Sequence, residues 1–116
     1  MKIPIKYLGV DTRFIYNVER WEVCNRTFLH DRNEVSGRNL RNNVIEKFGG
    51  DTLVGVDEWD LPTQPLNQLS CGANFMYYCE YWTLSSVSLG RYEVMNLQTG
   101  EIRTLNPNIT VYVLNY

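Results

Sequence analysis

The chain has 116 residues, of which 44% are hydrophobic and 21% are charged, and its formal net charge is −2. This length suits one domain around one core, and the apolar content excludes a disordered chain, so we expect a single domain over residues 1–116. No stretch approaches the roughly 20 apolar residues that cross a bilayer, and the first residues do not resemble a signal peptide. We therefore expect a cytoplasmic protein without membrane contact, whose three cysteines are reduced thiols.

Charge is distributed unevenly along the chain. Residues 1–48 carry nine Lys/Arg and six Asp/Glu, whereas residues 49–116 carry two Lys/Arg and seven Asp/Glu. Halves of opposite sign suggest either that they attract each other or that the protein meets a charged partner. The acidic net charge of the whole chain argues against nucleic-acid binding.

The first half suggests one strand followed by helices. Residues 3–8 predict a strand, with Pro4 at a sheet edge or at the strand start. Over residues 13–29 the apolar positions fall on half of a helical wheel, although the β-branched and aromatic content favours a strand, and we predict a helix. Residues 36–48 predict a second helix, because apolar residues recur every fourth position after a possible N-cap and before Gly49 and Gly50; these residues are Leu40, Val44 and Phe48.

The second half is predicted to be β. Residues 52–56 form a short strand candidate, residues 57–74 a long loop, and residues 75–84 an aromatic strand. Residues 88–96 and 101–105 flank a turn that ends at Gly100, and residues 109–114 alternate as a last strand. No internal repeat is visible. The expected fold is α+β: a basic N-terminal half with one or two helices, packed on a C-terminal antiparallel β-meander of about four strands.

No catalytic or ligand-binding motif is complete. Cys71 precedes Gly72 and could meet His30, the single histidine, in space, although cysteines in small proteins are more often inert apolar filler. Four possible Cys or His ligands, widely spread, argue against zinc, and no glycine-rich phosphate loop occurs. We expect no catalytic residue, metal or cofactor. The alternative is a small enzyme or small-ligand (nucleotide-like) binding protein that uses Cys71, His30 and tyrosine side chains.

An acidic segment surrounds one tryptophan. Asp57, Glu58 and Asp60 flank Trp59 in the predicted loop. Carboxylates around an exposed aromatic residue suit the basic surface of a partner, with the tryptophan as the anchor. The competing interpretation is that Trp59 fills the core and the carboxylates are only solvated.

The aromatic strand offers a second candidate surface. Residues 75–82 carry large side chains on both strand faces, and one face contains Tyr78 and Trp82. That face is either an exposed binding surface or is covered by the predicted loop. The predicted partner-binding residues are therefore Asp57, Glu58, Trp59, Asp60, Tyr78 and Trp82.

Together these features predict a small non-enzymatic interaction protein that binds another macromolecule through an acidic and aromatic surface. We expect another protein as the partner, with a homo-oligomer as a further option. Small domains of this type are common in viruses and mobile elements, where they inhibit host proteins, so an inhibitor of viral origin is one form that the analogy suggests.

Overall fold

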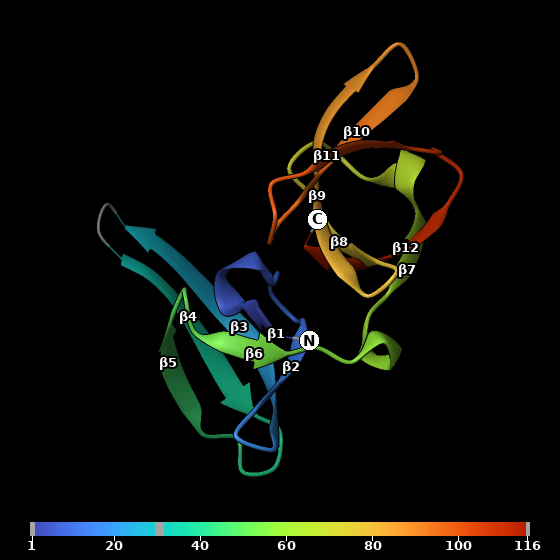
Figure 1. Ribbon diagram of the computed structural model, residues 1–116. Coiled ribbons are helices and arrows are strands. Elements are labelled where there is room, and N and C mark those ends of the chain that lie inside the picture. The colour runs from blue at the N-terminus through green and yellow to red at the C-terminus, as the bar shows by residue number, and fades with distance from the viewer. Residues whose placement is uncertain (1, 30–31, 116) are drawn as a thin grey trace. The chain divides into compact units, whose positions relative to one another are not determined.

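Antiparallel strands make up both halves of the chain (Figure 1). The computed structural model describes residues 2–29 and 32–115, and at 27–29 and 32–33 it describes the backbone alone. Over these residues the helical elements are short 3₁₀-helices and there is no α-helix. None of these helices has the length and apolar character of a membrane span. The chain divides into a first unit, Met1–Leu61, and a second unit, Pro62–Tyr116. The single domain expected over residues 1–116 stays a prediction.

The first unit is a six-stranded antiparallel sheet in the order β1-β6-β2-β3-β4-β5. Its strands are β1 (Lys2–Pro4), β2 (Arg13–Tyr16), β3 (Glu19–Leu29), β4 (Arg32–Asn39), β5 (Ile45–Gly49) and β6 (Leu53–Gly55). The 3₁₀-helix η1 (Ile5–Tyr7) follows β1, and η2 (Glu58–Asp60) follows β6. Pro4 lies in the edge strand β1, where a residue without an N–H breaks no inner ladder.

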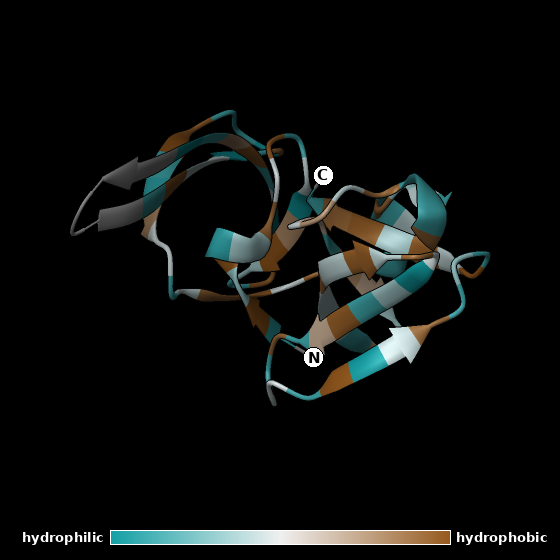
Figure 2. Ribbon diagram, turned by 90° about the horizontal axis from the view of Figure 1, so that it is seen from above, coloured by the Kyte–Doolittle hydropathy of each residue, from teal (hydrophilic) through white to brown (hydrophobic). Residues whose placement is uncertain are grey.

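The second unit is also a six-stranded antiparallel sheet, in the order β7-β12-β8-β9-β10-β11. Its strands are β7 (Thr63–Pro65), β8 (Asn74–Tyr77), β9 (Glu80–Ser88), β10 (Arg91–Asn96), β11 (Ile102–Leu105) and β12 (Thr110–Asn115). The 3₁₀-helix η3 (Leu66–Gln68) follows β7. Hydrophobic and hydrophilic residues alternate along several strands in Figure 2, as sheets with one buried face require.

The two units have the same topology. Each begins with an edge strand and a 3₁₀-helix, and its last strand inserts beside the first. The same hydrogen bond holds the 3₁₀-helix in each unit: Ile5 N donates to Thr52 O at 2.9 Å, and Leu66 N donates to Ile109 O at 2.9 Å. The chain is therefore an internal structural repeat, and the prediction of no repeat is wrong.

The sequence carries a trace of this repeat. Within residues 4–21, six residues recur 61 positions later: Pro4 and Pro65, Leu8 and Leu69, Phe14 and Phe75, Tyr16 and Tyr77, Glu19 and Glu80, Trp21 and Trp82. The hairpin that contains most of them is locked in the same way in both units. The tryptophan Nε1 donates to the tyrosine carbonyl oxygen across the turn, at 3.3 Å in the first unit and 3.4 Å in the second.

Each unit has its own apolar core. In the first unit Phe14 and Trp21 both contact Phe48 edge-on, with ring centroids 5.6 and 5.2 Å apart. Gly37 of β4 lies against this cluster, because a Cβ added there would come within 2.9 Å of both phenylalanine rings. The second core consists of Leu66, Leu69, Ala73, Phe75, Trp82, Leu84, Val94, Val111 and Val113.

The α+β prediction is wrong, because both predicted helices are strand–turn–strand segments. Over residues 13–29 the apolar residues change strand face at Asn17 and Val18, which form the β2–β3 turn with φ of 49° and 57°. On a helical wheel this phase change looks like a broad apolar face. Over residues 36–48 the four-residue spacing spans the end of β4, a turn and β5. Phe48 is buried as expected, but Val44 is exposed in the turn region.

The second half is closer to its prediction. Strand β6 lies within residues 52–56, β12 covers most of residues 109–114, and Gly100 has φ of 75° in the turn between β10 and β11. The predicted strand over 75–84 is instead the hairpin of β8 and β9, and the predicted loop over 57–74 contains η2, β7 and η3.

The division of charge does not follow the two units. Residues 1–61 contain nine Lys/Arg and ten Asp/Glu, and residues 62–116 contain two Lys/Arg and three Asp/Glu, so each unit has a net charge of −1. The acidic stretch before residue 61 belongs to the first unit and balances its basic residues. The expected contrast between a basic and an acidic half is therefore not a contrast between the folded units.

Candidate functional site

The acidic segment around Trp59 forms one fixed turn in the first unit. Asp57 precedes η2 and its Oδ1 accepts a hydrogen bond from Trp59 N at 3.1 Å. Asp60 N donates to Asp57 O at 3.0 Å, and Leu61 N donates to Glu58 O at 3.0 Å. These three bonds fix the backbone on both sides of the tryptophan.

Two further contacts attach this turn to the first unit. Arg20 of β3 donates from one guanidinium nitrogen to Asp60 Oδ2 at 3.2 Å, and the Asp60 carboxylate is mostly shielded from water. Leu61, directly after η2, is buried. The indole of Trp59 nevertheless remains 94% exposed, so it is not a core residue.

The carboxylates of this segment have different surroundings. Asp57 acts as the cap of η2 and Asp60 pairs with Arg20, whereas Glu58 lies half-buried in the first turn of η2. Two of the three predicted acidic residues therefore also hold the turn together. Residues 57–60 themselves contain three carboxylates and no Lys or Arg, so the segment brings negative charge to the surface around the indole.

Tyr78 lies at the β8–β9 turn of the second unit and is 83% exposed. Tyr78 and Cys79 both have positive φ, 52° and 59°, at the place that Asn17 and Val18 occupy in the first unit. The rings of Tyr77 and Tyr78 meet edge-on at 4.5 Å between centroids. The turn thus presents a paired aromatic surface.

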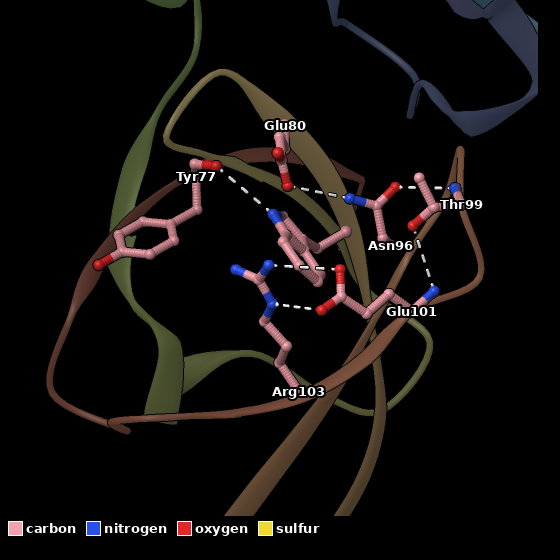
Figure 3. Close-up of polar contacts among 7 residues, drawn as sticks. Tyr77, Glu80, Asn96, Thr99, Glu101 and Arg103 are labelled. Carbon is pink, nitrogen blue, oxygen red and sulfur yellow. Dashed lines mark hydrogen bonds and ion pairs between the residues drawn. The ribbon is translucent and has the colours of Figure 1, made fainter.

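Trp82, the last predicted partner-binding residue, lies in the core of the second unit with 2% of its surface exposed. Its Nε1 donates to Tyr77 O at 3.4 Å, and the Arg103 guanidinium lies 5.4 Å from its ring centroid. Glu101 holds Arg103 by two hydrogen bonds, of 2.9 and 3.3 Å (Figure 3). Trp82 is thus a core residue of the hairpin and offers no surface to a partner.

The residues of the alternative function are not brought together by what the structure describes. His30 lies outside the described residues. Cys71 is exposed, as are Cys24 and Cys79, so the expectation of buried apolar cysteines is wrong. Tyr81 is buried, which raises the pKa of its hydroxyl, and the nearby Cys79 raises it further. Across residues 2–29 and 32–115, no group of three or more His, Cys, Asp or Glu side chains is placed to hold a metal ion.

A shallow groove in the first unit was not found from the sequence. It has a volume of about 360 Å³ and is lined by Lys2, Ile15, Tyr16, Asn17, Val18, Leu53 and Gly55. These residues come from β1, β2, the β2–β3 turn and β6, which are neighbours in the sheet but distant in the chain. The one sequence signal is internal: the second unit has Tyr112 where the first has Gly55.

Comparisons with known proteins give little similarity. No protein-family model matches the chain, and no curated protein matches it. Among solved structures, the chain is similar to eukaryotic translation initiation factor 5A from Methanococcus jannaschii, with 13% sequence identity and a TM-score of 0.37. That alignment covers 97% of this chain and 85% of the other. A score this low does not establish that the two chains share a fold.

Proposed function

We propose that this chain binds another protein through the Trp59 segment, residues 57–60, with Trp59 as the anchor. The supporting observation is the 94% exposure of an indole whose backbone is held on both sides by hydrogen bonds. Tryptophan is enriched among the residues that dominate interfaces, where truncation commonly costs about 2 kcal/mol or more.

The rigidity of the segment supports binding more than exposure alone would. Ordering a flexible loop during association lowers affinity, because the interface must offset the lost conformational freedom. Here the cap from Asp57 and the ion pair between Asp60 and Arg20 hold the turn before any partner arrives. Trp59 can therefore enter a pocket with little further cost in backbone entropy.

The chemistry of the partner follows from the residues beside the anchor. Asp57 and Glu58 place negative charge next to the indole, so the partner should carry an apolar pocket with Lys or Arg at its rim. The exposed Tyr78 of the second unit is proposed as an additional aromatic contact. The comparisons support neither the viral origin nor the inhibitory role suggested by analogy, and Trp82 is not included because it is buried.

The experiment is capture of partners from a lysate of the source cells by the immobilised full chain, identified by mass spectrometry. The wild type is compared with Trp59→Ala, with Trp59→Phe and with Ile45→Ala, which truncates another exposed apolar side chain of the first unit. We expect one stoichiometric protein that Trp59→Ala loses, Trp59→Phe partly keeps and Ile45→Ala keeps fully. Equal capture by all four proteins would contradict the proposal.

A further inference from the structure

We propose that the groove of the first unit is a second binding site, which takes a peptide segment of a partner protein in which an apolar side chain lies next to a carboxylate. The site uses Lys2, Ile15, Val18, Leu53 and Gly55, and none of these belongs to the Trp59 segment. The inference therefore goes beyond the proposed function and does not depend on it.

The floor of the groove is backbone because of one glycine. Gly55 of β6 pairs with Lys2 of β1 on one side and with Ile15 of β2 on the other. The exposed side chains of Ile15 and Leu53 form apolar walls around it. A volume of about 360 Å³ lies at the lower end of the range for ligand sites, and is enough for one large side chain with part of its backbone.

The second unit shows that the fold does not require this opening. Tyr112 of β12 holds the position of Gly55, because it pairs with Thr63 and Met76 as Gly55 pairs with Lys2 and Ile15. In the second unit Met76 is only 4% exposed, whereas Ile15, at the equivalent position of the first unit, is exposed. The glycine is not needed for packing either, since a Cβ at residue 55 would lie 3.8 Å from Ile15, an ordinary contact. Its effect is to leave the groove open.

Val18, which lines the groove, has a strained backbone conformation. Val18 has φ of 57° and is 99% exposed. A β-branched residue in the left-handed region is strained, and the second position of such a hairpin turn strongly prefers glycine. Asn17 before it already suits the turn. Cys79 has the same conformation in the second unit, so the strain belongs to the repeated hairpin, and what Val18 adds to the groove is an exposed apolar side chain.

The charge at the rim identifies the ligand. Among the described residues that line the groove, Lys2 is the one with a charge, and it is exposed. An ammonium group beside apolar walls complements a carboxylate that lies next to an aliphatic or aromatic side chain. Addition of the ligand as an extra strand is disfavoured, because β1 is three residues long and Pro4 lacks an N–H. The bound peptide should therefore be held by side-chain contacts.

The test is an NMR titration of the ¹⁵N-labelled full chain with acetyl-Glu-Leu-amide, a minimal probe with both features. Acetyl-Gln-Leu-amide lacks the charge and acetyl-Glu-Ala-amide lacks the large apolar side chain. We expect the amide chemical shifts of residues 15, 18, 53 and 55 to change and then saturate as peptide is added, with weaker binding of both control peptides. Lys2→Gln should lower affinity for the Glu peptide by roughly two- to fivefold, the range of an exposed ion pair, and remove its advantage over the Gln peptide.

Two variants separate binding from folding. Gly55→Tyr gives the first unit the residue of the second and should abolish the shifts while the chain stays folded. Val18→Gly relieves the turn, so it should raise Tm by roughly 2–6 °C and yet weaken binding several-fold. The matched control is Cys79→Gly, which relieves the equivalent turn of the second unit, raises Tm in the same way and leaves binding unchanged.

Three results would overturn the proposal. The first is the absence of shifts at the groove up to the solubility limit of the peptides. The second is a Val18→Gly protein that gains stability and binds as the wild type does. The third is a wild-type dimer in sedimentation velocity that Gly55→Tyr converts to a monomer, because a second copy of this chain would then occupy the groove.

Discussion

Asn39 donates from Nδ2 to Glu19 Oε2 over 2.6 Å, and this contact joins the end of β4 to the β2–β3 turn. The second unit repeats it, since Asn96 donates to Glu80 at 3.0 Å (Figure 3). Both asparagines are buried. In the turn that follows each of them, the Oδ1 of Asn39 accepts the backbone N–H of Arg41, and the Oδ1 of Asn96 accepts those of Gln98 and Thr99. One side chain thus connects two turns in each unit.

Replacement of either asparagine by alanine should destabilise the fold. Asn39→Ala and Asn96→Ala each leave a turn N–H and a glutamate without this partner, which typically costs about 1–3 kcal/mol. Urea unfolding followed by circular dichroism measures the loss. Asn42→Ala is the control, because Asn42 is exposed and accepts a hydrogen bond from Val44 N alone in its own turn, and its loss should be clearly smaller. Equal costs for all three variants would contradict the role of the buried asparagines.

A carboxylate in place of Asn39 should make stability depend on pH. In Asn39→Asp the new carboxylate faces Glu19 at about hydrogen-bond distance, so the pair holds a proton more tightly when folded than when unfolded. A folded pKa raised above the unfolded value gives stability that is present at low pH and lost as pH rises. The stability of the variant should therefore be close to that of the wild type near pH ~4 and lower than it near pH ~7. Urea unfolding midpoints at both pH values would show this. A pH-independent difference would contradict this.

Apolar spacing in the sequence marked the segments that form regular structure but predicted helices where the chain forms hairpins. The β2–β3 turn has Asn17 and Val18 where hairpins of this kind prefer Asn-Gly, so the usual turn signal is missing. The segment then looks like one amphipathic helix. By contrast, Gly100 marks its turn clearly, and the strands beside it were found. A comparison of the sequence with itself would have shown the repeat, since Phe14 and Trp21 recur as Phe75 and Trp82.

The candidate site depended on facts that local sequence does not contain. The exposure of Trp59 follows from the cap by Asp57 and the pairing of Asp60 with Arg20, which lies 40 positions away. The burial of Trp82 follows from its place in the repeated hairpin, which was not recognised as a hairpin. The two tryptophans cannot be told apart from composition alone, and tertiary contacts leave Trp59 exposed and place Trp82 in the core.

Gly37 should be sensitive to the smallest substitution. Gly37→Ala places a methyl group within 2.9 Å of the rings of Phe14 and Phe48, and overpacking of this kind costs about 1–3 kcal/mol. Gly49→Ala, also in a strand of the first unit, meets only Thr52 at 3.9 Å and should change stability much less. Thermal unfolding of both variants tests the difference. If Gly37→Ala melts with the wild type, the aromatic cluster does not pack against β4 as described.

Trp59 should dominate the fluorescence quenching of the native protein. Trp21 and Trp82 are buried and Trp59 is exposed, so acrylamide should quench Trp59 preferentially. Trp59→Phe should remove most of the quenchable emission and shift the remaining maximum to shorter wavelength. The measurement needs no partner and therefore tests the exposure of the anchor separately from its function. A Trp59→Phe protein that is quenched like the wild type would place Trp59 in the core.

The anchor and the charges of the Trp59 segment should affect binding kinetics differently. Trp59→Ala removes buried contact in the complex, so it should act mainly by faster dissociation from the captured partner. Asp57→Asn with Glu58→Gln removes charge while the amide oxygen of the new side chain can still cap η2, so it should slow association and weaken its dependence on salt. Surface plasmon resonance at low and high salt gives both rates, with Ile45→Ala as the control and circular dichroism as the test of folding. If the charge variant associates as fast as the wild type, the carboxylates hold the turn without steering a partner. If Trp59→Ala dissociates no faster than the wild type, the contact with the partner lies elsewhere on the chain.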